Sequence, residues 1–191
     1  GITHAAATMR PVKLLSTRLN KTRKFRLRKI ARLATTSRLA RKLFTGSGYA
    51  AATWGHQASA ISDSQIIALE RDALNCAGIK TNGRCRTIGL LVAYGKLGTP
   101  RARIIRESIN SWFELIKVCR SLHMIEDLKH AWQAARSHMM LHGNKVNHVK
   151  GFMTNVIFIL LKAGWIPRAY DLWIQPGGNQ WFLGQDSVSP A

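Results

Sequence analysis

The chain has 191 residues, of which 29 are Lys or Arg and 9 are Asp or Glu, so its formal net charge is +20 at neutral pH. Hydrophobic residues make up 46% of the sequence, which is enough to bury a core and excludes a wholly disordered chain. The three cysteines form no CxxC pair, which argues against a disulfide framework and a zinc-finger spacing and favours an intracellular protein (in nucleus, cytoplasm or organelle) with reduced thiols.

The N-terminal third carries most of the positive charge. The first acidic residue is Asp63, and 13 Lys or Arg residues precede it. Because no carboxylates lie nearby in the sequence to form ion pairs, these cations repel one another unless a polyanion supplies the counter-charge. Nucleic acid is the leading candidate for that polyanion.

The same segment predicts a basic helix. No Gly or Pro occurs between Val12 and Gly46, and long unbranched side chains favour helix. The apolar stripe is weak, with Thr22 and Arg26 where apolar residues are expected, so we expect the helix to bury little of its surface. We therefore predict a mainly α protein in which residues 1–45 form a basic helical arm and residues 46–191 form a helical bundle with a small terminal β-hairpin.

The next segments show helix boundaries and one possible phosphate site. Glycines at 46, 48 and 55 predict a small-residue hinge, in which Tyr49 and Trp54 either stack on bases or, as we favour, join the core. Ser62 and Gln65 have the spacing of a capping box, which predicts a helix that ends near Gly78. The basic loop 80–86 is either a second phosphate contact or simply solvated.

The rest of the chain predicts further helices and a hairpin. A short helix is expected over 87–94, and Thr99 followed by Pro100 predicts the start of a long one. Two helices then carry apolar residues at helical spacing: Ile105, Ile109, Trp112, Ile116 and Cys119 on the first, and Ile125, Leu128, Trp132, Ala135 and Met139 on the second. A last helix is expected from Asn147 to Gly164, and residues 172–174 and 181–183 predict a β-hairpin around QPGGNQ.

The sequence shows no catalytic or metal-binding constellation. It lacks the P-loop, dinucleotide-binding, zincin and nucleophile-elbow motifs, and Glu126 and Asp127 are adjacent on a helix, so their side chains diverge. The spacing of His138 and His142 can suit a pair of metal ligands, but no third ligand is obvious nearby. We therefore predict no metal site and no cofactor, and we expect no enzymatic activity from this chain alone.

The region from Lys24 to Asp63 resembles the segment after the catalytic palm in reverse-transcriptase-like proteins of retroelements. There a basic helix leads into a glycine-containing pattern that ends in Ser-Asp, and here Gly46, Trp54-Gly55 and Ile61-Ser62-Asp63 occupy similar places. The later NGRCRT, Gly164-Trp165, the aromatic hairpin and the terminal SPA are also similar. The resemblance implies a thumb-like, template-binding region of an RNA-directed DNA polymerase. Its partner would be a polymerase domain encoded upstream, because this chain contains no Asp-Asp.

We thus expect a nucleic-acid-binding module that holds a template–primer duplex, RNA or DNA, through phosphate contacts without base specificity. The alternative is an RNA-binding structural protein of a ribonucleoprotein particle, such as an organellar ribosome. No membrane span is expected, because the longest apolar stretch, 152–165, is short and contains polar residues. The predicted phosphate ligands are Arg18, Lys21, Arg23, Lys24, Arg26, Arg28, Lys29, Arg32, Arg38, Arg41 and Lys42.

Overall fold

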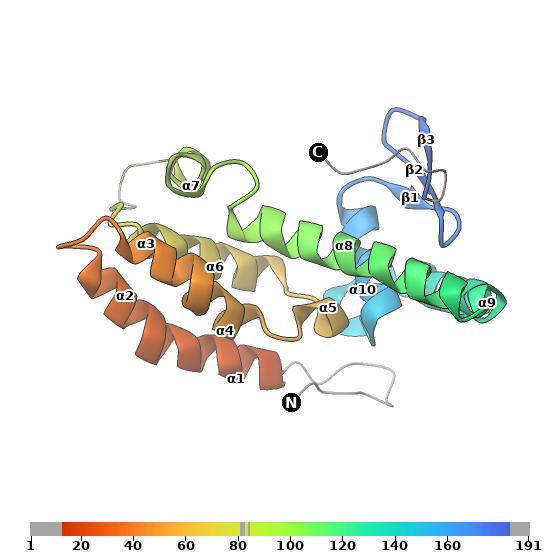
Figure 1. The fold of residues 1–191 in the computed structure, drawn as a ribbon, viewed down its shortest axis with the longest axis horizontal. Coiled ribbons are helices and arrows are strands. Elements are labelled where there is room, and N and C mark those ends of the chain that lie inside the picture. Colours follow the sequence, from red (N-terminus) through yellow and green to blue (C-terminus); the bar gives the residue numbers. More distant parts are fainter. Residues whose placement is uncertain (1–12, 81–82, 84, 184–191) are drawn as a thin grey trace. The chain divides into compact units, whose positions relative to one another are not determined.

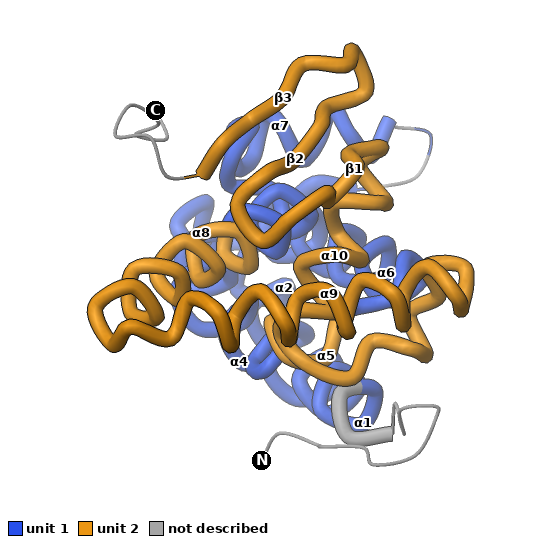
Figure 2. Tube along the Cα trace, turned by 90° about the vertical axis from the view of Figure 1, so that its right-hand side faces the viewer, with its two compact units in different colours: residues 1–3, 11–56, 61–106 blue, residues 4–10, 57–60, 107–191 orange. Residues whose placement is uncertain are grey.

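The computed structural model describes residues 13–80, 83 and 85–183, with side chains from residue 16 onward. The predictions for residues 1–12, including a helix start at Pro11, lie outside the described residues. The chain divides into two compact units, which take in the described parts of 11–56 and 61–106 and of 57–60 and 107–191 (Figure 2). Both are mainly helical, and a small antiparallel sheet lies near the C-terminal end, which confirms the predicted fold class (Figure 1).

The first unit begins with a helical hairpin. Its first rod consists of α1 (Lys13–Thr22), the π-helical turn η1 (Arg23–Leu27) and α2 (Arg28–Leu33). Its second rod consists of α3 (Ala40–Leu43), the π-helical turn η2 (Phe44–Gly48) and α4 (Tyr49–Thr53), and it packs against the first, α3 on α2 and α4 on α1. The predicted single helix is therefore interrupted, and η2 occupies the place of the predicted hinge.

The break between the two rods has a local cause. The hydroxyl groups of Thr35 and Thr36 donate hydrogen bonds to the carbonyl oxygens of Arg32 and Leu33, at 2.7 and 3.0 Å. Such side-chain bonds compete with the backbone ladder of a helix. Consecutive threonines followed by Ser37 thus end the helix although no Gly or Pro is present.

The basic segment is not a separate arm, which corrects the predicted organisation. Leu19, Leu27 and Ile30 from the first rod and Phe44 from the second are buried in one core with Leu69 and other residues of α6 (Asp63–Cys76). The predicted boundary at residue 45 falls inside η2. Burial of apolar side chains holds the basic rod in the first unit.

Helix α6 begins and ends as predicted. The Ser62 hydroxyl accepts a hydrogen bond from the backbone N–H of Gln65, and the Gln65 side chain accepts one from the N–H of Ser62. At the other end Gly78 has a φ of +72°, and the N–H of Ile79 donates to the carbonyl of Leu74. This is a Schellman motif. The unit also contains α7 (Arg86–Tyr94) and the first turns of α8 (Pro100–Ser121).

The second unit is built around apolar helices. It contains the rest of α8, α9 (Ile125–Leu141), the 3-10 turn η3 (Val146–His148) and α10 (Phe152–Lys162), as well as residues 57–59 of α5 (His56–Ser59). Trp112 and Trp132 are buried in its core, as their helical spacing predicts, and Phe158 of α10 is buried with them.

Two helix predictions need correction. Ile105 is exposed, and the neighbouring Ile104 is buried in its place. Helix α10 begins at Phe152 rather than near Asn147, because the backbone is extended at Val149 and Gly151. The hydroxyl of Thr154 then accepts a hydrogen bond from the N–H of Gly151 at 3.0 Å and thereby caps the new start.

The predicted hairpin is present and gains a third strand. Strands β1 (Ile166–Pro167), β2 (Leu172–Ile174) and β3 (Gln180–Phe182) form an antiparallel sheet in that order, with Trp173 paired to Trp181. Trp173 is buried in the core of the second unit. None of the described helices combines the length and the apolar character needed to cross a membrane.

Candidate nucleic-acid interface

A wide helical turn decides which side chains of the basic rod are exposed. In η1 the backbone N–H of Arg28 donates to the carbonyl of Arg23, five residues earlier, so this turn holds one residue more than a regular turn. The extra residue brings Leu27 into the core after Thr22 and leaves Arg26 exposed. The apolar stripe of this basic segment looked weak in the sequence because a regular α-helical period places Arg26, and not Leu27, on the buried side.

Seven of the eleven predicted phosphate ligands have exposed side chains that form no ion pair with a described residue. Five of them lie on the first rod, and two more follow, one at the turn and one on α3. In chain order they are Lys21, Lys24, Arg28, Lys29, Arg32, Arg38 and Lys42. We call the five on the first rod, Lys21, Lys24, Arg28, Lys29 and Arg32, the basic face.

The other four predicted ligands make contacts within the first unit. Arg18 donates to the carbonyl of Trp54 at 2.6 Å, Arg26 to that of Ser47 at 3.3 Å and Arg41 to that of Ala93 at 3.4 Å. Arg23 pairs with Asp72, with a nitrogen–oxygen distance of 2.5 Å. These four residues brace the fold as well as adding positive charge.

The acidic residues of this unit lie close to arginines. Residues 13–106 contain 20 Lys or Arg but only three Asp or Glu. Asp72 pairs with Arg23, Asp63 with Arg101 at 3.2 Å, and Glu70 with both Arg86 and Arg101, at 3.1 and 3.5 Å. The pKa of Asp72 is raised, because the effect of burial exceeds that of the hydrogen bond and charge of Arg23, which lower it. No acidic side chain in the described part of this unit therefore pairs with the basic face.

A groove runs beside the basic face. Its volume is about 360 Å³. It is lined by amide and basic side chains of the first rod and of α6, by one carboxylate that pairs with Arg23, and by two apolar side chains, namely Asn20, Arg23, Lys24, Arg28, Asn75, Asp72, Leu27 and Ala31. Lys24 and Arg28 are one helical turn apart, so both reach this groove from the same side. Amide and guanidinium donors of this kind suit phosphate oxygens.

Two exposed aromatic side chains belong to the same unit. Phe25, on the first rod, is 56% exposed, and the ammonium group of Lys24 lies 5.6 Å from its ring centre. Trp54 is 64% exposed, whereas Tyr49 is buried beneath the guanidinium of Arg103. Tyr49 is thus a core residue, as favoured, but Trp54 is not. Exposed rings near cations can stack on unpaired bases.

Two other candidate sites were identified in the sequence, the basic loop 80–86 and the pair His138 and His142. In the basic loop 80–86, Lys80 is exposed and Arg86 pairs with Glu70, while 81, 82 and 84 lie outside the described residues. His138 and His142 lie next to a third histidine, His148, whose position along the chain does not mark it as an obvious third ligand. This cluster belongs to the second unit.

Comparison of the chain with protein-family models, with curated proteins and with solved structures gives no significant match.

Proposed function

We propose that this protein binds nucleic acid through the basic face of its first unit. The observation that carries the proposal is the lack of counter-charge: the acidic side chains of the unit pair with arginines outside the basic face. Five cations on one short rod create a positive potential that phosphate groups can neutralise with release of counterions.

The rod is suited to hold these cations in place. Leu19, Leu27 and Ile30 anchor it in the core, so its exposed side chains project from a backbone that folding has already ordered. Binding then requires mainly the ordering of Lys and Arg side chains, which lowers the entropic cost of association. Phosphate contacts of this type position a duplex and do not read its sequence.

A more specific proposal concerns which nucleic acid the protein binds, and it rests on the resemblance to reverse-transcriptase-like proteins. On that basis we propose a template–primer-holding role, in which an RNA–DNA hybrid is the preferred ligand. A structural role in a ribonucleoprotein particle instead predicts preference for structured RNA. Fluorescence anisotropy with a hybrid, a DNA duplex and an RNA hairpin of equal length separates the two roles.

The central experiment is a salt titration of binding with a charge-neutralised variant. The change is Lys24→Gln, Arg28→Gln and Arg32→Gln together, three exposed residues spaced four apart. If each contacts a phosphate of a duplex, the slope of log affinity against log salt should become shallower by roughly 3. Affinity should fall to a similar extent for unrelated sequences.

The matched control removes three exposed charges outside the rod, by Lys96→Gln, Arg106→Gln and Lys117→Gln. It changes the net charge by the same amount, so its slope should stay close to that of the parent protein. Equal slopes for the two triple variants would refute a specific role for the basic face. Circular dichroism and thermal unfolding check that both variants remain folded.

A further inference from the structure

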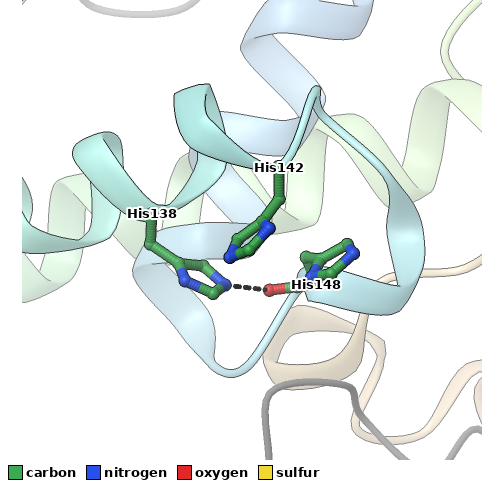
Figure 3. Close-up of side chains that lie close together, drawn as sticks. All are labelled: His138, His142 and His148. Atoms are coloured by element: carbon green, nitrogen blue, oxygen red, sulfur yellow. Dashed lines mark hydrogen bonds between the residues drawn. The ribbon is translucent and has the colours of Figure 1, made fainter.

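The second unit contains a cluster of three histidines that sequence spacing did not reveal. His138 lies in the last turns of α9, His142 at its C-terminal end, and His148 at the end of η3 (Figure 3). One ring nitrogen from each lies within 4.8 Å of those of the other two. Histidines 138 and 142 are one helical turn apart, and the chain reversal after α9 supplies the third.

The loop that brings His148 back is held firmly at both ends. The N–H groups of Gly143 and Asn144 donate to the carbonyls of Met140 and Met139, and Gly143 and Asn144 both have positive φ. Met139 and Val149, which immediately follow His138 and His148, are fully buried. The imidazoles are therefore positioned by core residues, not by a free loop.

The rings already face one another. His142 and His148 stack with their centres 4.2 Å apart and their planes 6° from parallel, and the centre of His138 lies 4.6 Å from that of His142. Nε2 of His138 lies 3.0 Å from the carbonyl oxygen of His148. Because a carbonyl only accepts, Nε2 of His138 is the donor in this hydrogen bond.

Two polar atoms of this loop have no hydrogen-bond partner among the described residues. They are Nδ1 of His148 and Oδ1 of Asn144, and both are buried. Buried polar atoms are normally paired, so this unpaired ring nitrogen, which lies in a cluster of imidazoles, is open to a ligand. A hydrogen-bond donor or a metal ion can satisfy it.

We propose that His138, His142 and His148 bind one divalent transition-metal ion, with zinc as the reference ion. Three imidazoles with a position left open are a known ligand set for zinc, at about 2.0–2.1 Å per nitrogen. Nitrogens at that distance around a tetrahedral ion lie roughly 3.4 Å apart, so small side-chain rotations complete the site. Imidazole selects such ions over calcium or magnesium, which prefer oxygen ligands.

The local charge sets a limit on the affinity. Partial burial lowers the pKa of His142, the neighbouring His148 and His138 lower it further, and Lys150 and Lys145 add the smallest contributions. The same lysines repel a bound cation. We therefore expect a single site of moderate affinity that joins the end of α9 to η3, independent of nucleic-acid binding.

The test is a zinc titration of the untagged full chain, stripped of metal, in competition with a chromophoric chelator. One zinc ion per chain should bind, and His142→Ala and His148→Ala should each weaken binding by about tenfold or more, since loss of outer-shell partners alone costs that much. His130→Ala on the exposed side of α9 and Cys85→Ser, which removes an exposed thiol, should bind as the parent does.

Two readouts make the result decisive. Cobalt should give the visible absorption of a tetrahedral site in the parent protein and lose it in His142→Gln, which keeps a polar side chain in case the alanine variants unfold. Zinc should also raise the unfolding temperature of the parent but not of His142→Gln. Absence of stoichiometric binding, or equal binding by all the variants, would overturn the proposal.

Discussion

At the scale of single residues, Trp112 and Trp132 form the centre of the second core. Their ring centres lie 4.7 Å apart, and the indole N–H of Trp112 donates to the carbonyl of Tyr170 at 2.9 Å. We expect Trp132→Ala to lower the free energy of unfolding by about 3–5 kcal/mol, because it leaves a large cavity in a packed core. Chemical denaturation followed by circular dichroism measures this loss.

The control is Trp54→Ala, which truncates the same kind of side chain at an exposed position. It should change the free energy of unfolding by no more than about 0.5 kcal/mol, as surface substitutions usually do. A loss of similar size at both positions would show that Trp132 is not the anchor of this core.

At the scale of elements, the contact of Gly78 with the basic rod ties α6 to the end of α2. A Cβ atom at Gly78 would lie 2.9 Å from the carbonyl oxygen of Ala34, and the φ of Gly78 is +72°. Gly78→Ala should therefore destabilise the protein by about 1–3 kcal/mol, from backbone strain and from the clash. Thermal and denaturant unfolding both report the change.

Gly83→Ala is the matched comparison. Gly83 also has a positive φ, +69°, but no atom of the described residues lies within 4 Å of a Cβ built there. Gly83→Ala should lower the free energy of unfolding only by the cost of backbone strain. The difference between the losses of the two variants therefore measures the contact of Gly78 with the end of α2. Equal losses would mean that α2 does not pack against the end of α6.

At the scale of the whole molecule, the nine acidic residues are few and dispersed over both units. Glu126 pairs with Lys129 at 2.6 Å, and Glu114 with Lys117 at 2.9 Å, both on exposed helix surfaces. Nucleotidyl transfer requires carboxylates that converge on metal ions about 4 Å apart. We expect the purified chain to extend no primed template with magnesium or manganese. Reproducible extension that a single Asp or Glu substitution abolishes would contradict this.

Local signals in the sequence predicted much of the secondary structure. The Ser62–Gln65 capping box, Pro100 at the start of α8 and the QPGGNQ turn each depend on a few neighbouring residues, and all three appear in the structure. Trp112 and Trp132 were found for a similar reason, since helical spacing alone places them on buried faces. The cluster of positive charge before Asp63 is also a property of the sequence alone.

Two features of the protein depend on tertiary structure and could not be predicted from local sequence patterns. The π-helical turn at Arg23–Leu27 shifts the buried face by one residue, so a regular period could not show that the basic rod packs into a core. Likewise, only the chain reversal after α9 places His148 beside His138 and His142. The number of charges and the helical period can be counted in the sequence. Which cations are exposed, and which histidines lie together, depends on the distant segments that folding brings into contact, because the burial of a side chain depends on the whole packed unit.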